Sequence, residues 1–273
     1  MTAFPCDFIK VKQVTPAYWR ATFSDPPLNL MNDRFFCDLA KLIDAIEASR
    51  DVKVVVFDSS VSYFWIAHYD ALGSSYPWAE DGWWWKSLLR LVHAPVLTVA
   101  SIRGRARGGG SEFALALDVR FGSREHAIIS QFEITTGTLP AGGALEWLPT
   151  QIGRSRALEV AIGGRDFPAE LAERYGLLNR AVPDSELDKF VDAFARRVAL
   201  FEKASIATIK KLVNKRSELR TADDWLESFN AFTERLADPA VREHVQKASA
   251  LGFSRDADFE LNLPDNLTRL YEQ

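Results

Sequence analysis

Cysteine is nearly absent from this chain, as are several features that would place a protein in a special class. Among its 273 residues are only two cysteines, Cys6 and Cys37, with neither CxxC spacing nor a nearby histidine pair. We therefore expect a reducing compartment and no metal site. No apolar run approaches the roughly 20 residues that span a bilayer, and the opening residues MTAFPCDFIK lack the apolar region of a signal peptide. These absences predict a cytoplasmic protein with no membrane partner.

The chain also lacks an excess of positive charge. Its 33 Lys and Arg and 37 Asp and Glu give a formal net charge of −4, so the overall field does not favour nucleic acid as a partner. With 47% hydrophobic and 26% charged residues, the composition is that of a globular protein. Disordered, collagen-like and coiled-coil chains are excluded.

Tryptophan, in contrast, is abundant. Five of the eight tryptophans lie in one short stretch, as Trp65, Trp78, Trp83, Trp84 and Trp85. Such a group of large aromatic side chains builds either a hydrophobic core or the wall of a pocket. Three consecutive tryptophans cannot all face one side of a helix, so we expect at least one in the core while another faces a ligand.

The spacing of apolar residues predicts an α/β core. Alternation over residues 9–14 and 18–23 predicts two half-exposed strands, and residues 35–46 have the spacing of an amphipathic helix. The continuous apolar runs at 52–60 and 96–102 are typical of buried strands in a mainly parallel sheet. These patterns predict that strands and helices alternate along this part of the chain.

The last part of the chain has a different pattern. Beyond residue 200, three helical patterns follow one another without strands between them; the second contains Trp225, Phe229, Phe232 and Leu236. We therefore predict a core over residues 1–200 that holds the active site, and a helical region over residues 201–273.

A triple glycine, residues 108–110, lies between a predicted strand and a helix-forming run. Backbone N–H groups at such a turn can point outward at the positive end of the helix and bind an anion. Neither GxxxxGK[ST] nor GxGxxG is present, so stabilisation of an oxyanion is favoured over phosphate binding. Close packing of helix against sheet is the alternative explanation for these glycines.

Two carboxylates accompany the glycines. Glu112 falls in the first helical turn and Glu133 follows 21 residues later. Alone, Glu112 could simply complement the helix dipole. Beside an oxyanion site, the two could share the work of general acid and general base.

These motifs resemble those of the crotonase (enoyl-CoA hydratase/isomerase) superfamily. Residues 93–164, which include RGRARGGGSEFALALDVR and TTGTLPAGGALEWLPTQIG, are similar to the family pattern KPVIAAVxGxxxGGGxELALxCDxRxA and the FxxPExxxGxxPxxGGxxxLPRxxG that follows it. AERYGLLNRAVP, residues 172–183, is similar to AERxGLVNRVVP. The resemblance implies a spiral of ββα turns and a C-terminal helical region that forms homotrimers or hexamers.

The resemblance also implies roles for individual residues. The two catalytic glutamates of the hydratases correspond to Glu112 and Glu133. The oxyanion hole would use the backbone N–H of Gly109 and, by a gapless alignment from Phe64 with the family's AGAD motif, that of His68. The substrate would be an acyl-CoA, with coenzyme A as part of the substrate and no separate cofactor.

A further set of residues is expected around the substrate. It comprises Trp65, Ile66, Tyr69, Trp84, Arg107, Phe132 and Gly142. Arg107 could meet a phosphate of CoA or a substrate carboxylate, or lie solvated at a surface. The tryptophans predict an aromatic acyl pocket that excludes long straight chains and prefers a short or ring-bearing acyl group.

The loop that aligns with AGAD departs from the family, because Ile66, His68 and Tyr69 are bulkier than its small residues. Either the loop follows the same path with its side chains turned away, or the ligand is not an ordinary CoA ester. For His68 three roles stay open: a backbone donor, a structural histidine, or an imidazole that acts on the substrate.

The principal hypothesis is therefore an enoyl-CoA hydratase-like lyase. An enoyl-CoA isomerase and a hydrolase that cleaves a C–C bond of a diketone are the enzymatic alternatives. A non-catalytic trimeric scaffold, or a nucleic-acid binder that uses Lys210, Lys211, Lys215 and Arg216, is the alternative of another class.

Overall fold

The strands of the protein form two sheets. The computed structural model describes residues 7–73, 82–217 and 220–272, so Trp78 lies outside the described residues. The larger sheet has the order β1 (Ile9–Thr15), β2 (Tyr18–Phe23), β3 (Val54–Ser59), β5 (Leu97–Ile102), β7 (Val119–Ser123), β10 (Arg180–Val182). The smaller has the order β4 (Phe64–Ile66), β6 (Arg105–Arg107), β8 (Ile128–Ser130), β9 (Asp166–Pro168). Only the β1–β2 and β8–β9 pairs among these are antiparallel.

Consecutive strands alternate between the two sheets. β3, β5 and β7 enter the larger sheet, and β4, β6 and β8 follow them in the smaller one. Helices α2 (Trp83–His93) and α3 (Gly109–Ala116) complete the first two turns, and the 3₁₀ turn η2 (Glu133–Thr136) with α4 (Ala144–Ile152) completes the third. This repeat is the ββα spiral that the resemblance to the crotonase superfamily implies.

The predicted elements form for the expected physical reasons. Helix α1 (Asp33–Ala48) begins at the N-cap Asn32, whose side chain accepts from two backbone amides, and it buries the predicted apolar face. The first four residues of β3 are buried, because helices and strands cover both faces of the sheet. The two sheets thus hold the turn before α3 on a rigid base.

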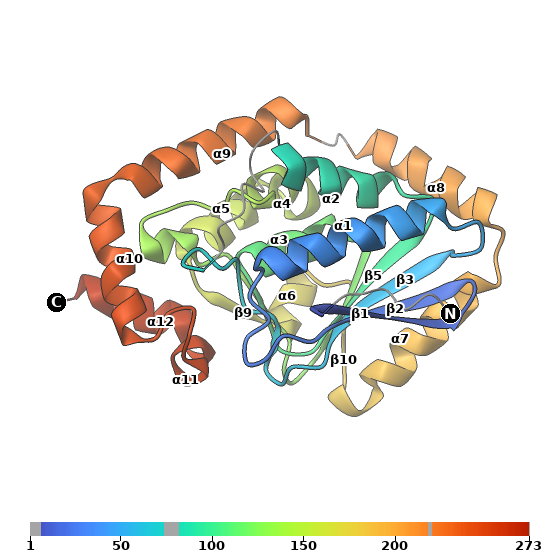
Figure 1. Cartoon of the computed structure of the whole chain (residues 1–273), viewed down its shortest axis with the longest axis horizontal. Coiled ribbons are helices and arrows are strands. Elements are labelled where there is room, and N and C mark those ends of the chain that lie inside the picture. Colours follow the sequence, from blue (N-terminus) through green and yellow to red (C-terminus); the bar gives the residue numbers. More distant parts are fainter. Residues whose placement is uncertain (1–6, 74–81, 218–219, 273) are drawn as a thin grey trace.

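The remaining helices cover the sheets and extend beyond them. After α5 (Arg154–Gly163), α6 (Ala169–Tyr175) and α7 (Asp184–Ala199), the chain continues as α8 (Lys203–Arg216), α9 (Ala222–Ala237), α10 (Pro239–Leu251), α11 (Ala257–Leu261), α12 (Leu263–Thr268) and η3 (Arg269–Tyr271). The predicted helical region is therefore present, and residue 200 falls between α7 and α8; the division into two domains stays a prediction. Figure 1 shows α9 and α10 passing around one end of the molecule to α11 and α12.

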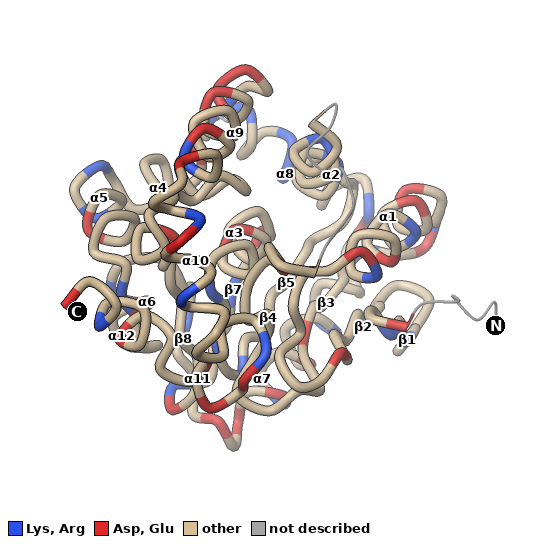
Figure 2. The backbone as a smooth tube through the Cα atoms, turned by 60° about the vertical axis from the view of Figure 1, so that its left-hand side comes forward, with Lys and Arg blue, Asp and Glu red and all other residues tan. Residues whose placement is uncertain are grey.

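Charged residues lie mainly on the outside of this arrangement. Figure 2 shows both signs along the outer helices α1, α7 and α9. Within residues 7–73, 82–217 and 220–272, none of the helices is both long and apolar enough to cross a membrane.

Candidate active site

The glycine turn between β6 and α3 serves two purposes. A Cβ on Gly110 would lie 2.5 Å from the carbonyl oxygen of Ile66, so only glycine lets α3 pack this closely on β4. Gly108 has φ 48°, a left-handed conformation that favours glycine, and its N–H donates to the carbonyl of Ser130 at 2.9 Å. Gly109 is the first residue of α3, where an amide has no acceptor within its own helix. Close packing of helix against sheet therefore explains Gly110, and stabilisation of an oxyanion by the amide of Gly109 stays a prediction.

This turn opens onto a cavity of about 400 Å³. Eight of the eleven predicted site residues line it, namely His68, Tyr69, Trp84, Gly109, Glu112, Phe132, Glu133 and Gly142. They come from segments far apart in the sequence, and the spiral brings them together. The cavity is the candidate active site.

Glu112 is held on one wall by backbone amides. Its Oε1 accepts from the N–H of Gly142 at 2.7 Å and from that of Ala144 at 3.2 Å. The indole of Trp84 donates to the carbonyl of Gly142 at 2.8 Å, which fixes this segment. Burial raises the pKa of Glu112 to about 7, although the two amide bonds act to lower it. Glu112 is thus able to exchange a proton near neutral pH.

Glu133 lies across the glycine turn. A Cβ on Gly108 would come within 2.8 Å of its Oε1. In the amide orientation that satisfies its neighbours, Gln131 donates to both oxygens of Glu133 at 3.2 Å and accepts from Ser111 Oγ at 3.0 Å. Burial, and then the charge of Glu112, raise the pKa of Glu133 well above its usual value. The two carboxyls therefore differ in environment: two backbone amides bind Glu112, and the side-chain amide of Gln131 binds Glu133.

The loop opposite Gly109 presents Tyr69, one residue beyond the prediction. Met31 donates to the carbonyl of His68 at 2.9 Å and accepts from the N–H of Asp70 at 3.1 Å. Because peptide groups alternate along an extended segment, the N–H of Tyr69 points away from Met31. A Cβ on Gly109 would lie 3.4 Å from that nitrogen. The amide facing the glycine turn is therefore that of Tyr69 and not that of His68.

A bulge in β4 explains the difference. Phe64 and Ile66 pair with the consecutive residues Arg105 and Ala106 of β6, so β4 contains one extra residue. A gapless count from Phe64 consequently ends one residue too early.

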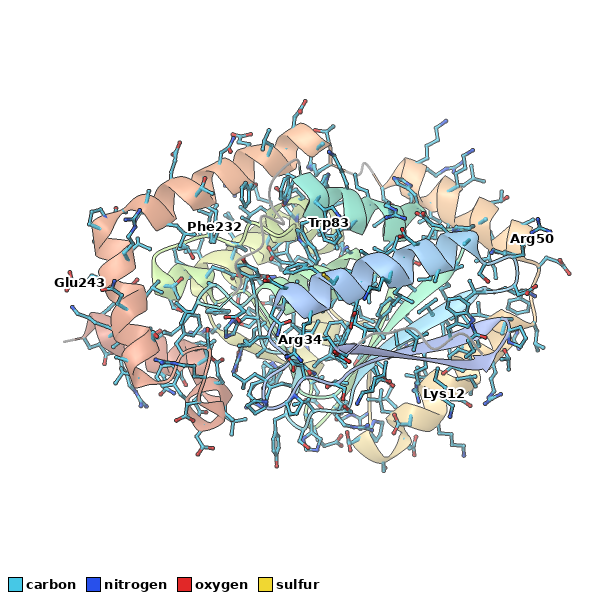
Figure 3. All side chains as sticks on the ribbon, viewed as in Figure 1. Lys12, Arg34, Arg50, Trp83, Phe232 and Glu243 are labelled. Carbon is cyan, nitrogen blue, oxygen red and sulfur yellow. The ribbon has the colours of Figure 1, made fainter. Side chains whose placement is uncertain are left out.

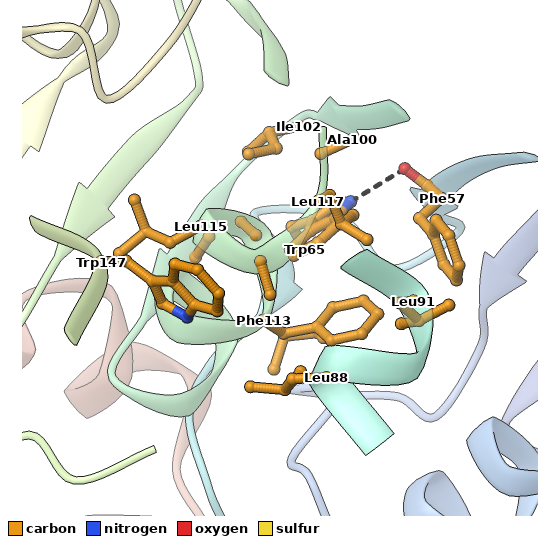
Figure 4. Packing of buried hydrophobic residues seen from close by; sticks show 14 of the residues in the cluster. Phe57, Trp65, Leu88, Leu91, Ala100, Ile102, Phe113, Leu115, Leu117 and Trp147 are labelled. Atoms are coloured by element: carbon orange, nitrogen blue, oxygen red, sulfur yellow. Dashed lines mark hydrogen bonds between the residues drawn. The ribbon is translucent and has the colours of Figure 1, made fainter. Parts of the chain in front are cut away.

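Trp65 and Ile66, predicted as substrate-binding, are core residues instead. Both are completely buried and lie outside the set of residues that line the cavity. Trp65 stacks on Phe113 with ring centroids 6.0 Å apart, and its indole donates to the carbonyl of Phe57 at 3.4 Å, as Figure 4 shows. Trp65 thus packs in the hydrophobic core and supports the start of the loop from there.

The consecutive tryptophans divide as predicted. Trp84 lines the cavity, whereas Trp85 is completely buried and packs against Trp147 and Trp225 with centroid distances of 5.2 and 6.4 Å. One helix therefore supplies both a cavity wall and a core contact.

Arg107 was also predicted to contact substrate, and the structure contradicts this. Its side chain is completely buried, and its Nε and Nη2 donate to the carboxylate of Asp166 at 2.8 and 2.6 Å. The same guanidinium donates to the carbonyls of Glu260 and Leu261. Since these carboxylate and carbonyl oxygens accept from all three nitrogens of the guanidinium, Arg107 links β6 to β9 and to α11 rather than binding a ligand.

His68 reaches the cavity, but protein groups hold both of its ring nitrogens. Nδ1 lies 2.7 Å from the carbonyl oxygen of Tyr69, and Nε2 lies 3.1 Å from Oε1 of Glu260. The ring stacks on Phe253 at 4.8 Å. Burial acts to raise the pKa of Glu260, yet that pKa lies below its usual range because His68, the amide of Ser254 and Arg107 stabilise the carboxylate. This arrangement favours a structural role for the imidazole.

The sequence did not predict that the C-terminal helices line the cavity. Trp225, Phe229, Phe232 and Leu236 of α9 do so, together with Val245 and Phe253. Figure 3 shows Phe232 on the inner side of α9 and Glu243 on the outer side of α10. The aromatic residues at helical spacing were the available signal, but they had been assigned only to a helical region after the core.

A second cavity, of about 580 Å³, lies between α8 and α4. Its buried cation, Lys210, donates to the carbonyls of Leu91 and Val96 at 2.9 Å and to the carboxylate of Asp118 at 2.7 Å. An ammonium group has three hydrogens to donate, and these partners use them. The two carboxylates that line this cavity already have protein partners: Asp118 accepts from Lys210, and Glu146 accepts from Ser228 Oγ at 2.6 Å.

Comparisons with known proteins agree with this geometry. The model of the enoyl-CoA hydratase/isomerase family matches residues 19–247. The crystal structure of a candidate enoyl-CoA hydratase from Streptomyces avermitilis superposes with a TM-score of 0.91 at 34% identity and covers 98% of each chain. A probable mitochondrial enoyl-CoA hydratase of Dictyostelium discoideum is 27% identical over 232 residues, 83% of this chain and 80% of that protein. A monofunctional enoyl-CoA isomerase from M. smegmatis superposes with a TM-score of 0.66 at 27% identity, over 80% of this chain and 98% of that one. The chain belongs to the enoyl-CoA hydratase/isomerase family, which is a family of enzymes.

Proposed function

We propose that the protein is a hydratase-like lyase that adds water to, or removes it from, a short or ring-bearing acyl-CoA. One observation carries the proposal: two carboxyls with raised pKa share a cavity with a pair of backbone amides. The amides of Gly109 and Tyr69 would bind the thioester oxygen. Each such donor contributes roughly 3–4 kcal/mol to stabilising the transition state.

The environments of the two glutamates suggest how they divide the work. The ionised form of Glu112 is stabilised by two amides, so Glu112 is suited to take a proton from water as the hydroxyl oxygen bonds to the β-carbon. Burial and the charge of Glu112 raise the pKa of Glu133 well above its usual value, so Glu133 is suited to hold a proton and donate it to the α-carbon as the enolate collapses. Transfer of the proton from Glu112 back to Glu133 completes the addition of one water.

The wall of the cavity suggests the kind of acyl group. Trp84, Phe132, Trp225, Phe229 and Phe232 line a space of about 400 Å³. Rigid aromatic side chains favour flat or compact apolar groups, and a long straight chain would have to displace them. We therefore propose a short or ring-bearing acyl group on coenzyme A, with no other cofactor.

Assembly and location belong to the same proposal. The helices after residue 200 are the region through which we propose that homotrimers or hexamers form. A cytoplasmic location stays a prediction, since the relative from Dictyostelium discoideum is described as mitochondrial.

An assay of the hydration of crotonyl-CoA and cinnamoyl-CoA tests the proposal. The loss of absorbance of the enoyl group measures the rate. Glu112→Gln and Glu133→Gln should each lower kcat by about 10²- to 10⁴-fold. Glu146→Gln is the matched control, because Glu146 is also buried and its pKa is also raised by burial, but it lies outside the cavity lining. Unchanged hydration in both glutamate variants would refute the assignment.

An isomerase is the second candidate, because of the similarity to the enzyme from M. smegmatis. But-3-enoyl-CoA separates the two: an isomerase converts it to the conjugated ester faster than it hydrates crotonyl-CoA. The diketone hydrolase has less support, since His68, on which it relied, is held by Tyr69 and Glu260.

A further inference from the structure

Helix α11 contacts both arms of the proposed oxyanion hole through one residue, Glu260. Its side chain is completely buried, and Oε1 lies 3.1 Å from Nε2 of His68 and accepts from the N–H of Ser254 at 2.7 Å. Its backbone carbonyl accepts from the guanidinium of Arg107. His68 immediately precedes Tyr69, the donor on one arm. Arg107 ends the strand that leads into the glycine turn, the other arm.

The hydrogen positions at His68 follow from its neighbours. A carbonyl oxygen can only accept, so Nδ1, which lies 2.7 Å from the carbonyl of Tyr69, must carry a hydrogen. The contact between Nε2 and Glu260 then requires one more proton shared between the two groups. With that proton, three hydrogen bonds can form at the same time: His68 Nδ1 to the carbonyl of Tyr69, His68 Nε2 to Glu260, and the N–H of Ser254 to Glu260.

We propose that Glu260 is a positioning residue that fixes both amide donors of the oxyanion hole, through His68 on the Tyr69 arm and through Arg107 on the Gly109 arm. This inference rests on the proposed function. It assigns to the C-terminal helices a role in catalysis in addition to covering the cavity. Glu260 itself does not line the cavity, so its effect is exerted through His68 and Arg107.

Glu260→Gln removes one hydrogen bond while keeping the shape of the side chain. If the amide oxygen takes the place of Oε1, a neutral His68 can donate either to it or to Tyr69, but not to both. If the amide is turned, its NH₂ group faces the N–H of Ser254. In every arrangement with a neutral imidazole one bond is lost, so the loop that carries the Tyr69 amide is held less firmly.

The experiment compares wild type, Glu260→Gln, His68→Phe and Arg105→Leu in two assays. Arg105→Leu is the matched control, because Nε of Arg105 donates to the carbonyl of Leu261 at 3.0 Å. It therefore ties the same strand to the same helix without contacting Glu260 or His68. One assay is hydration of crotonyl-CoA, with kcat and KM measured separately. The other is amide hydrogen exchange of the protein without ligand, which does not depend on substrate.

For Glu260→Gln we expect kcat to fall about 10- to 100-fold, because a small displacement of catalytic groups has an effect of that size. KM should stay within about two-fold, since the polarising contact strengthens mainly in the transition state. Exchange over residues 64–70 should be faster by a factor of about 5 to 10, the effect of one lost hydrogen bond. His68→Phe should share these effects, and Arg105→Leu should show neither.

Two results would overturn the inference, and they are distinguishable. If Glu260→Gln leaves kcat and the exchange of residues 64–70 unchanged, or if Arg105→Leu reproduces its effects, Glu260 only docks the helix. If wild type hydrates no enoyl-CoA while exchange at residues 64–70 still depends on Glu260, the proposed function fails and the catalytic role of Glu260 fails with it.

Discussion

Replacing Glu112 with glutamine should stabilise the protein at alkaline pH and change its stability little under acid conditions. Glu112 is 3% exposed, and burial raises the pKa of its carboxyl from 4.5 to about 7. In the folded state the neutral form is therefore favoured. The stability linked to this group is present below pH 4.5 and is lost as the pH rises through about 7.

The size of the effect follows from the shift. A difference of one pKa unit corresponds to about 1.4 kcal/mol, so a rise from 4.5 to about 7 corresponds to about 3 kcal/mol lost by pH 8. Glutamine carries no charge at either pH, and its carbonyl oxygen can still accept from Gly142 and Ala144. Glu112→Gln should therefore gain about 3 kcal/mol relative to wild type between pH 4 and pH 8.

Urea unfolding, followed by tryptophan fluorescence at several pH values, measures this difference. All samples should have one protein concentration, because any association makes the midpoint depend on concentration. Glu227→Gln is the control for the loss of one carboxylate, since Glu227 is exposed on α9. If the difference between Glu112→Gln and wild type did not change with pH, or if glutamine were more harmful at pH 8 than at pH 4, the reasoning on burial would be refuted.

Three further predictions concern the cavity and its surroundings. Gly142→Ala should lower kcat at least about 10-fold in the hydration assay, because the new Cβ would overlap the carboxylate of Glu112; full activity would mean that Glu112 does not need this position. Lys210→Met should lower the free energy of unfolding by about 3–5 kcal/mol, since it removes a buried ammonium and leaves the partly buried Asp118 without its cation, and a loss below about 1 kcal/mol in urea titrations would contradict the pairing. The pH profile of kcat/KM should be bell-shaped, rising through about 7 as Glu112 ionises and falling at higher pH as Glu133 loses its proton; a flat profile between pH 5 and 9 would exclude this division of roles.

Local patterns in the sequence were enough for an α/β core and for part of the site, whereas the spiral arrangement was implied by the resemblance to the crotonase superfamily. The alternating and continuous apolar runs predicted the strands, because burial on one face or on both leaves a direct trace in composition. The glycine triplet and the two glutamates could be predicted because their chemistry requires particular residue types close to a strand-to-helix turn.

The remainder of the site depends on contacts between distant segments. The extra residue in β4 is visible only in its pairing with β6, and without it the amide that faces the glycine turn was assigned to His68 instead of Tyr69. The contact between His68 and Glu260 joins residues 192 apart in sequence. Likewise, Arg107 was predicted to bind a ligand because Asp166, which accepts two of its hydrogen bonds, is marked by no local pattern.

A crystal structure of the protein with acetoacetyl-CoA, which in its keto form lacks the α,β-double bond that takes up water, tests the central claim most directly. The claim predicts that the thioester oxygen lies about 2.7–3.1 Å from the amide nitrogens of both Gly109 and Tyr69, between the two glutamates. A thioester oxygen bound elsewhere, or bonded to only one of these amides with the other turned away, would contradict it.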